Sequence, residues 1–478
     1  MGHDDMLSEH ALYLVAAAIE SDSDLAIVYS DEDRIDKGGL RSLPFFKPDW
    51  DPDLFLGQNL IGQLGACRSD LVRRSGGLRE DFEGAEDRDL ALRMLDSTPG
   101  AKVHHIPFVL YHRRRTDDAL HPTAPSGAAA AAQRAVNEHF TRTGEDAAAI
   151  PTGHLDHLRI RRGLPAERPL VSIVIPTKNQ CALLRTCFDG LLNRTGYAPI
   201  EIVVVDNGSD ADDARAFLAD IRRRPNVKVV EDARRFNFSR LVNLGVAASS
   251  GEICVLLNND VDVINTDWLD ELVSHVIRPE VGAVGAMLYY ADDTVQHGGV
   301  ILGINGVAGH EHKHAPRGSH GYFGRLGLAH QLSCVTGACI AIRREVYDAL
   351  GGFNERDLTV GLNDVDFCVR LRLAGYRIIW TPHAELYHYE SISRGRATAT
   401  AEGSARHAAE VAYVRRQWGP VLDGDPYYNP NFTLDSLAFG LDAATRVRKP
   451  WLDFAAARSR GGCGAPNEDA AGALRWSQ

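Results

Sequence analysis

The chain has 478 residues, of which 44% are hydrophobic and 24% are charged, as is typical of a folded globular protein. Its 64 acidic residues outnumber its 52 lysine and arginine residues, and the net charge of −12 argues against general nucleic-acid binding. The eight cysteines include no CxxC pair, which favours a reducing compartment over a disulfide scaffold. The longest apolar run, residues 11–19, is too short to span a membrane and follows acidic residues, so it predicts a helix rather than a signal peptide.

Residues 1–120 predict a small α/β unit. The elements expected after the first helix are a strand over 25–29, a Pro- and Asp-rich loop over 45–53, a helix from Glu86 to Leu95 and a strand over 103–111. Residues 121–168 have a different composition, with an Ala-rich stretch over 128–140 followed by scattered Gly and Pro. We interpret 121–168 as a linker that contains one helix.

A second domain, expected over residues 169–422, begins with continuous apolar runs that are typical of parallel strands covered on both faces. Strands are predicted over 170–176, 201–206, 227–230 and 253–257, with helical spacing between them. Alternation of this kind predicts a parallel α/β sheet. The sequence has neither GxGxxG nor GxxxxGK[ST], so neither a dinucleotide fingerprint nor a P-loop supports this sheet.

The stretch from Gly251 to Asp262 contains the first candidate site residues of the second domain. Its predicted strand ends in Asn258-Asn259-Asp260, and open α/β sheets bind ligands at the carboxyl ends of their strands. A carboxylate there can hold a hard divalent cation, which in turn can hold a diphosphate, so Asp260 is the first candidate. The alternative is an ordinary Asn/Asp turn after a strand.

The region beyond residue 290 contains further candidates. Residues 296–330 are rich in Gly and His and include His310, His312 and His314, but partners at metal-site spacing are not evident, so a flexible polar active-site loop is favoured over a zinc site. Residues 362–366 open a helix that Gly375 closes, and a strand over 377–380 follows. The tail, 423–478, is rich in Asp, Pro and Asn, and its end predicts disorder.

Two segments of the chain repeat each other. Gly76-Gly77, Asp87-x-Asp89 and Leu110-Tyr111-His112 recur as Gly351-Gly352, Asp364-x-Asp366 and Leu386-Tyr387-His388, and the Asp-to-His spacing is 25 (112 − 87) and 24 (388 − 364). The first unit lacks the strands that the second has between Pro169 and Leu257. We expect that the first unit is a truncated copy and not a unit that packs against the second to complete its fold. The reason is that Met1 lies only a few residues before the acidic motif Asp4-Asp5.

The second domain resembles glycosyltransferase family 2, whose members have the GT-A fold. The residues that carry the resemblance are Val171-Ser-Ile-Val-Ile-Pro-Thr-Lys-Asn179, Val205-Asp206-Asn-Gly-Ser209, Phe236-Asn-Phe-Ser239 with Asn243-Leu-Gly245, Leu257-Asn-Asn-Asp260, Asn363-Asp364-Val-Asp366 and His388-Tyr-Glu-Ser-Ile-Ser-Arg394. The similarity is greatest to rhamnosyltransferase-like members, which are often tandem. It implies an α/β, Rossmann-like, mostly parallel sheet flanked by helices, preceded here by a partial copy of the same fold.

The resemblance also implies roles for particular residues. Asp260 and His388 would hold Mg²⁺ or Mn²⁺ against the diphosphate of a sugar nucleotide, and Asp364 would take the proton of the acceptor hydroxyl in a single displacement that inverts the anomeric centre. The donor-binding set is Pro176, Thr177, Asn179, Asp206, Ser209, Asn237, Asn243, Asn259 and Asp260. The set on the acceptor side or its loop is Gly298, Gly299, Glu390, Ser391 and Arg394.

Each role has a simpler alternative. Asp364 is expected at a helix N-terminus, which lowers the pKa of a carboxyl group, and it could be only an N-cap. His388 could be a structural histidine at the end of a strand. The family usually has Glu where this chain has Asn363, which leaves a second carboxylate beside Asp364 in doubt.

The implied function is an inverting glycosyltransferase of bacterial surface polysaccharide synthesis, with a donor such as dTDP-rhamnose and a glycan or lipid-linked acceptor. We expect it in the cytoplasm, with at most peripheral contact at the inner face of the plasma membrane, through Arg113-Arg114-Arg115. The first alternative is a degenerate protein that binds a sugar nucleotide or glycan without catalysis. A nucleotidyltransferase would show a Gly-rich basic fingerprint near the first strand, which Pro176-Thr-Lys-Asn179 is not.

Overall fold

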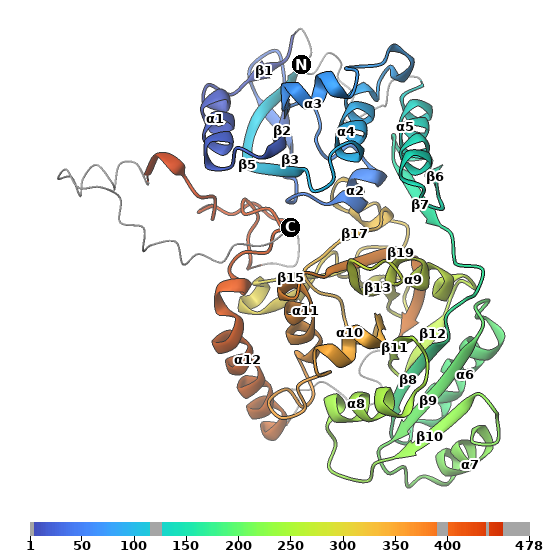
Figure 1. The fold of residues 1–478 in the computed structure, drawn as a ribbon. Helices are drawn as coiled ribbons and strands as arrows, with labels where there is room; N and C mark the ends of the chain where they lie inside the picture. Colours follow the sequence, from blue (N-terminus) through green and yellow to red (C-terminus); the bar gives the residue numbers. More distant parts are fainter. Residues whose placement is uncertain (1–3, 115–126, 390–399, 436–438, 453–478) are drawn as a thin grey trace.

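Two large sheets organise the residues that the computed structural model describes, which are 4–114, 127–389, 400–435 and 439–452. The smaller sheet belongs to the N-terminal unit, at the top of Figure 1, and the larger belongs to the second unit below it. Apolar side chains of the larger sheet form a core on each of its faces, and the smaller unit has cores of its own.

The first half of the larger sheet is parallel, as the apolar runs predict. β10 (Val227–Glu231), β9 (Ile200–Asp206), β8 (Val171–Thr177) and β11 (Ile253–Leu257) lie side by side in that order. Every residue of β8 and β11 is buried, because helices cover both faces. One face carries α6 (Cys181–Asn193), α7 (Asp212–Ile221) and α9 (Trp268–Val276), and the other carries α8 (Phe238–Ala248), α10 (Arg344–Ala349) and α11 (Asn363–Leu373).

The second half of the sheet is mixed. β18 (Cys339–Arg343) runs antiparallel between β11 and β13 (Val281–Tyr289), and β13 runs parallel to β19 (Arg377–His388). β12 (Val261–Val263), β14 (Val295–His297) and β17 (His330–Gln331) pair antiparallel at the margins. With four parallel and five antiparallel ladders among the described residues, the prediction of a mostly parallel sheet is wrong for this half. The reason is that β18 is reached through the long segment 290–338 and not through a crossover helix.

The Gly- and His-rich segment is packed, which differs from the predicted polar loop. It contains β15 (Val300–Leu302), η2 (Ile304–Gly306), β16 (Ala308–His310) and η3 (Tyr322–Gly327). Glu311 is fully buried there, 3.3 Å from Arg325 and 3.6 Å from His330. Because the charge of Glu311 is paired, the segment can be buried away from water. The segment lies beneath the first unit and contacts it, since the Tyr322 hydroxyl donates to the carbonyl of Pro44.

The first unit has a five-stranded sheet. Its strands are β1 (Met6–Leu7), β2 (Leu25–Ile35), β3 (Arg41–Phe45), β4 (Gly65–Cys67) and β5 (Lys102–Arg114), in the order β1-β5-β2-β3 with β4 paired to β2. Its helices are α1 (Ala11–Ser21), α2 (Pro52–Gly57), α3 (Ser69–Arg74), η1 (Glu80–Phe82) and α4 (Glu86–Asp96). The predicted helices over 11–19 and 86–95 and the strands over 25–29 and 103–111 are present within these bounds.

Side chains from residues 131–160 belong to the core of the first unit. α5 (Ala128–Thr143) is the predicted helix, but the hairpin of β6 (Ala147–Pro151) and β7 (Leu158–Arg162) was not predicted. Val136 and Phe140 of α5 and Ile160 of β7 are buried in one cluster with Leu92 and Met94 of α4. The small alanine side chains on one face of α5 allow this close approach, so the stretch is a structural part of the unit.

The strand pairing of the first unit recurs in the second. β5 is parallel to β2 and antiparallel to β1, and β2 is antiparallel to β4. In the second unit β19 is parallel to β13 and antiparallel to β12, and β13 is antiparallel to β18. In register, His112 faces Met6 and His388 faces Val261.

A helix anchor recurs as well. Arg93 and Arg370 each lie four residues after an aspartate, Asp89 or Asp366, and form an ion pair with it. Arg93 donates to the carbonyl of Gly77 at 2.7 Å, and Arg370 donates to that of Gly352 at 2.8 Å. Each arginine thus ties the start of its helix to the preceding Gly-Gly turn.

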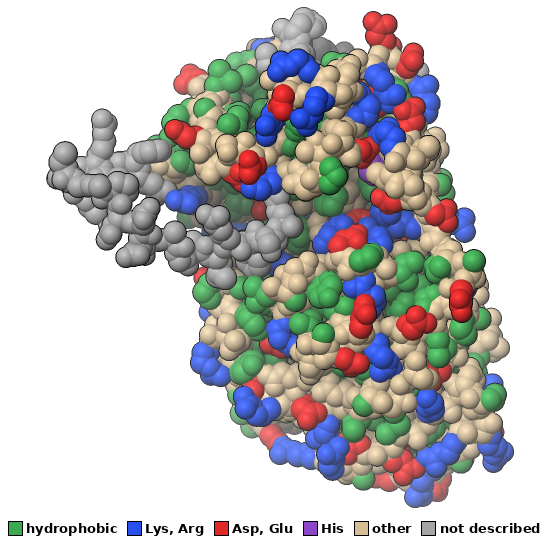
Figure 2. All heavy atoms as spheres, in the orientation of Figure 1, with side chains coloured by type: hydrophobic (Ala, Val, Ile, Leu, Met, Phe, Trp, Pro, Cys, Tyr) green, Lys and Arg blue, Asp and Glu red, His purple; other side chains and the backbone are tan. Residues whose placement is uncertain are grey.

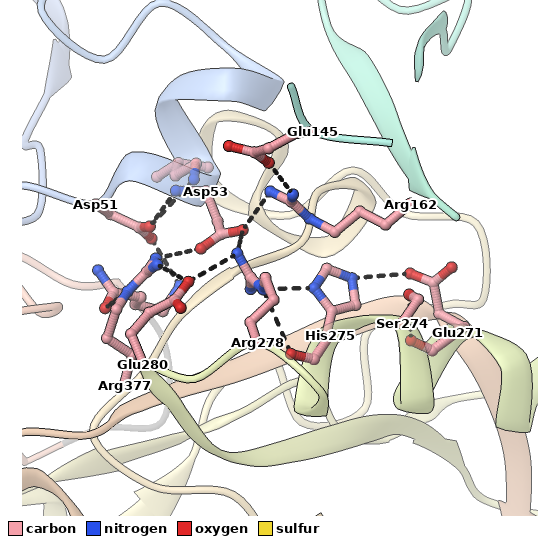
Figure 3. A network of polar contacts seen from close by, with 12 residues as sticks. Asp51, Asp53, Glu145, Arg162, Glu271, Ser274, His275, Arg278, Glu280 and Arg377 are labelled. Carbon is pink, nitrogen blue, oxygen red and sulfur yellow. Dashed lines mark hydrogen bonds and ion pairs between the residues drawn. The ribbon is translucent and has the colours of Figure 1, made fainter. Parts of the chain in front are cut away.

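A network of charged side chains joins the two units. Asp53, at the start of α2, is buried and accepts hydrogen bonds from Arg162 of β7 at 3.4 Å, Arg278 at 2.9 Å and Arg377 of β19 (Figure 3). On the face drawn in Figure 2, blue and red side chains meet at this junction. Burial alone would raise the pKa of Asp53, but Arg278, Arg377 and Arg162 together hold it well below its usual range.

Residues of the C-terminal segment also bridge the units. Long helix α12 (Ala401–Leu422) packs on the second unit, and the chain then turns toward the first. Asn429, which is buried, donates to both oxygens of Asp31 at 3.0 Å and to the carbonyl of Lys47 at 2.8 Å. The predicted disorder at the end of the tail lies outside the described residues. Within the described ranges, no helix combines the length and the apolar character needed to cross a bilayer.

Replacing Asp53 with alanine should destabilise the protein. The change leaves three guanidinium groups without their buried counter-charge, which costs about 3 to 5 kcal/mol. Because the pKa of Asp53 is depressed, its contribution is present above about pH 4 and is lost as the pH falls toward its folded-state pKa. Denaturant unfolding at pH 7 and at acidic pH measures both effects.

The matched control for this test is Asp24→Ala, because the Asp24 side chain is 76% exposed and lies 3.7 Å from Lys102. Its unfolding free energy should stay within about 0.5 kcal/mol of the unaltered protein. Equal stability of the two variants at pH 7 would contradict the role given to Asp53.

Candidate active site

A cavity of about 890 Å³ lies at the carboxyl ends of β8 and β11, where an open α/β sheet binds its ligands. Its walls come from the loops after these strands, from the start of α11 and from the start of α12. The predicted residues that line it are Pro176, Thr177, Asn179, Asn259, Asp260, Asp364 and His388. Candidates that lie far apart in the sequence therefore meet at one site.

Hydrogen bonds between residues at the carboxyl ends of the strands, including β8 and β9, fix one wall of the cavity. Asn259 donates to the hydroxyl of Thr177 at 3.0 Å. The backbone N–H of Asn179 donates to the Ser209 hydroxyl at 2.8 Å, and that hydroxyl donates to Asp206 at 2.5 Å. Asp206 and Ser209 thus lie behind the wall and hold Asn179, instead of lining the cavity as the sequence predicts.

Asp260 and His388 come together because β12 pairs with the end of β19. The register places Val261 opposite His388, and Nε2 of the imidazole lies 3.2 Å from Oδ1 of Asp260. Gln296 fixes the ring, since its Nε2 donates to the carbonyl of His388 at 3.1 Å and its Oε1 accepts from Nδ1 at 2.6 Å. A proton on Nδ1 leaves the lone pair of Nε2 directed toward Asn258 and Asp260.

This arrangement suits a hard divalent cation. A carboxylate oxygen and an imidazole lone pair 3.2 Å apart are two donor atoms that a cation between them would satisfy, and Gln296 is the outer partner that orients such a histidine. No group of three His, Cys, Asp or Glu side chains within the described ranges could hold a metal ion. Mg²⁺ is commonly bound by one or two protein ligands together with substrate phosphates and water, so a pair of ligands is sufficient.

Asp364 enters the cavity from the second position of α11. Its Oδ2 accepts from the N–H of Gly337 at 2.9 Å, and its Oδ1 accepts from that of Val365 at 2.9 Å. The residue at the cap position is Leu362, which has a left-handed backbone, so Asp364 is not the N-cap of this helix. Neighbouring Asn363 is buried and donates to Ser239 at 3.2 Å, a structural contact.

The pKa of Asp364 differs from the sequence-based expectation. Its carboxyl group is partly exposed through the cavity, but burial by the surrounding protein raises its pKa above the usual value, although the N–H groups of Gly337, Val365 and Asp364 oppose this. The expected lowering by the helix N-terminus is therefore wrong, because loss of water outweighs the backbone dipoles. A raised pKa makes this carboxylate a stronger base.

Four predicted residues have structural contacts outside the cavity lining. Asn237 caps α8 by accepting from the N–H of Arg240 at 3.0 Å. Asn243 donates to the carbonyl of Phe353 at 2.9 Å and supports the turn before α11. Gly298 and Gly299 are buried between β14 and β15, where an added Cβ would meet Leu326 or Leu332. The predicted residues Glu390, Ser391 and Arg394 lie outside the described residues.

Helix α12 contributes residues to the cavity that were not predicted from the sequence. Thr400, Gly403 and Arg406, at the start of this helix, line the cavity opposite the sheet. An arginine on an Ala-, Glu- and Arg-containing helix has no local signature of a site, since such a pattern usually marks a solvent-exposed face. Only the packing of α12 against α11 brings Arg406 to the cavity.

Comparison with known proteins gives a family match that includes β8, β11 and the loops after them, and that ends before Asp364 and His388. Residues 172–351 match the family model described as "Glycosyl transferase family 2". An uncharacterized protein of Sinorhizobium fredii is 45% identical over 447 residues, which are 93% of this chain and 49% of that protein. The O-antigen biosynthesis protein RfbC of Myxococcus xanthus is 40% identical over 447 residues, which are 92% of this chain and 34% of that protein.

A more distant relative matches a smaller share of the chain. The N-acetylglucosaminyl-diphospho-decaprenol L-rhamnosyltransferase of Mycobacterium tuberculosis is 29% identical over 222 residues, which are 42% of this chain and 70% of that protein. The chain spans about half the length of the Sinorhizobium relative and about a third of that of the Myxococcus relative. Residues 172–351 are therefore similar to a glycosyl transferase family 2 domain.

Proposed function

We propose that residues 169–422 form an inverting, metal-dependent GT-A glycosyltransferase that moves a sugar from a nucleotide-sugar donor to a glycan or lipid-linked acceptor. One observation carries this proposal. The Asp260–His388 pair and the Asp364 carboxylate share a single cavity at the carboxyl ends of parallel strands. A site for a metal ion and a separate base in one cavity would serve the transfer of a sugar to a hydroxyl, because the metal can stabilise the leaving diphosphate while the base takes the proton.

The donor end of the cavity is the metal side. Asp260 and His388 would hold Mg²⁺ or Mn²⁺, which when bound neutralises the charge that builds on the leaving diphosphate. Thr177, Asn179 and Asn259 lie beside these ligands and offer hydroxyl and amide groups to the nucleoside. Asp206 and Ser209 act from behind by holding Asn179 in place.

Asp364 is the proposed base. Its carboxylate takes the proton of the acceptor hydroxyl while that oxygen attacks the anomeric carbon and the diphosphate leaves. A single displacement of this kind inverts the anomeric centre. Burial supports the role, because the raised pKa of Asp364 brings its basicity closer to that of a working general base.

The donor, the acceptor and the location are proposed from the relatives. A rhamnosyltransferase and an O-antigen biosynthesis protein among them support a deoxysugar donor such as dTDP-rhamnose and a lipid-linked acceptor in bacterial surface polysaccharide synthesis. We place the enzyme in the cytoplasm, with peripheral contact at the inner membrane face. Of the basic run suggested for that contact, Arg113 and Arg114 are described and Arg115 lies outside the described residues.

We propose that the first unit is a partial copy of the second and has no catalytic role. The matching strand registers and the two arginine anchors support the duplication. The proposed division is a partial unit over 1–120, to which the described part of 121–168 adds a helix and a hairpin, the complete unit over 169–422 and a tail over 423–478. We favour catalysis over a degenerate binding protein, since the second unit has the complete set of Asp260, Asp364 and His388 at one cavity.

The metal requirement predicts that a chelator abolishes turnover. Asp260→Ala removes one of two protein ligands, so it should weaken nucleotide binding in the presence of Mn²⁺ and leave metal-free binding unchanged. Asp262→Ala is the matched control, because this neighbouring carboxylate forms an ion pair with Arg194 and does not line the cavity. Full turnover in excess chelator would contradict the proposal.

Loss of the base predicts a large fall in transfer with little change in donor affinity. Asp364→Asn keeps the shape of the side chain and should reduce kcat by about two to four orders of magnitude, the range for a general base. Asp87→Asn is the matched control, because Asp87 occupies the corresponding position in the first unit. A fall of less than about tenfold would show that Asp364 is not the base.

The pH profile gives a second readout of Asp364. Transfer needs the ionised carboxylate, so kcat/KM should fall as the pH drops through its pKa. Because burial raises that pKa, the fall should occur above about pH 4, where an exposed aspartate titrates. The residual activity of Asp364→Asn should lack this acid limb.

The donor proposal predicts a preference among nucleotide sugars. A panel of dTDP-, UDP- and GDP-linked sugars, each with Mn²⁺ and scored by release of the nucleoside diphosphate, should give the highest kcat/KM with dTDP-rhamnose. A clear preference for a uridine or guanosine donor would refute the donor part while leaving the reaction class intact.

A further inference from the structure

The cavity that contains the two carboxylates is also lined by four cationic side chains, which come from Lys178, Arg234, Arg235 and Arg406. Arg234 forms an ion pair with Asp232 at 2.7 Å, and Arg235 forms one with Glu402. Both are more than half exposed, with side-chain exposures of 63% and 86%, and Lys178 is exposed as well. These three therefore keep much of their hydration.

Arg406 differs from the other three. It is half-buried, and its Nε is shielded from water yet has no hydrogen-bond partner in the described ranges. It also forms no ion pair there. A guanidinium group that has lost part of its hydration without gaining an anion is costly, and an anionic ligand in the cavity would supply the missing partner.

The position of Arg406 is fixed by contacts farther along α12. Glu410, one helical turn later, is buried and accepts from the N–H groups of Val360 at 2.9 Å and Gly361 at 3.3 Å. Trp418 donates from its indole nitrogen to Asp366 at 2.9 Å. These contacts tie α12 to the loop before Asp364 and to the helix that carries it, so Arg406 is held relative to the proposed base.

We propose that Arg406 binds the diphosphate of the nucleotide-sugar donor. This inference rests on the proposed function, which supplies the ligand class. The planar fork of an arginine matches two phosphate oxygens, and it would counter the negative charge that Asp260 and Asp364 bring to the same cavity. The phosphate of a lipid-linked acceptor has the same chemistry, and the donor is favoured because Arg406 lines the cavity that contains the Asp260–His388 pair.

The test is titration of the full-length protein with dTDP, UDP and GDP in MnCl2, without acceptor. For the nucleotide that the unaltered protein binds most tightly, Arg406→Gln should raise Kd by about tenfold to a hundredfold, as expected for loss of a charged hydrogen-bonded pair. Binding of the corresponding nucleoside should be unchanged, because it has no phosphate. Arg406→Lys keeps the charge but loses the fork, so its Kd should lie between the two.

Arg416→Gln is the matched control. Arg416 lies on the same helix, is exposed and does not line the cavity, so the variant removes one positive charge without touching the site. Its Kd for the nucleoside diphosphate should equal that of the unaltered protein. An equal rise in both variants would indicate a general charge effect and would overturn the proposal.

The remaining outcomes distinguish failure of the proposed glycosyltransferase function from failure of the inference about Arg406 alone. If the unaltered protein binds none of the three nucleoside diphosphates, the proposed function fails and the inference fails with it. If it binds one of them and Arg406→Gln binds it equally well, only the inference fails. If Arg406→Gln weakens the binding of nucleoside and nucleoside diphosphate alike, Arg406 is structural, and this result also overturns the proposal.

Discussion

Val261 faces His388 in the short antiparallel ladder between β12 and β19, and this register brings the Asp260 carboxylate to 3.2 Å from the imidazole. A slip of one residue would turn His388 to the other face of the sheet and separate the pair. The second half of the sheet fixes the register, since β19 is paired along most of its length with β13. The mixed order of strands therefore brings together Asp260 and His388, which lie far apart in the sequence.

The two units share a pattern of strand pairing and an aspartate–arginine anchor, but the elements around them differ. The aspartate–arginine anchor at the start of α4 and α11 depends only on local contacts with the preceding Gly-Gly turn, and both units keep it. Asp364 differs from Asp87 because β8, β9 and β11 and helix α12 build a cavity around it. The anchor explains why the Asp-x-Asp pattern repeats, whereas the proposed chemistry requires elements that the described part of the first unit does not contain.

The sequence predicts the periodic parts of this fold and the residues at the ends of its buried strands. Asp260 could be singled out because it follows a short, fully apolar strand, whereas the roles given to Asp364 and His388 come from the resemblance to glycosyltransferase family 2. The roles of Asn237 and Asn243 could not be predicted, since an amide that binds a ligand and one that caps a helix or supports a turn look alike in a sequence. The raised pKa of Asp364 depends on its burial in the folded protein, and the place of Arg406 depends on the packing of α12 against α11; neither has a local pattern in the sequence.

The bridge made by Asn429 has a consequence for the order of folding. Synthesis runs from the N-terminus, and domains generally fold as they emerge, so both sheets can form while the bridging segment is still to be made. Asp31 and Lys47, however, receive their hydrogen bonds from a residue almost 400 positions later in the chain, at a separation of 398 residues for Asp31. The junction between the units can therefore be completed only after residue 429 has left the ribosome, and until then Asp31 and Lys47 lack the hydrogen bonds that Asn429 donates.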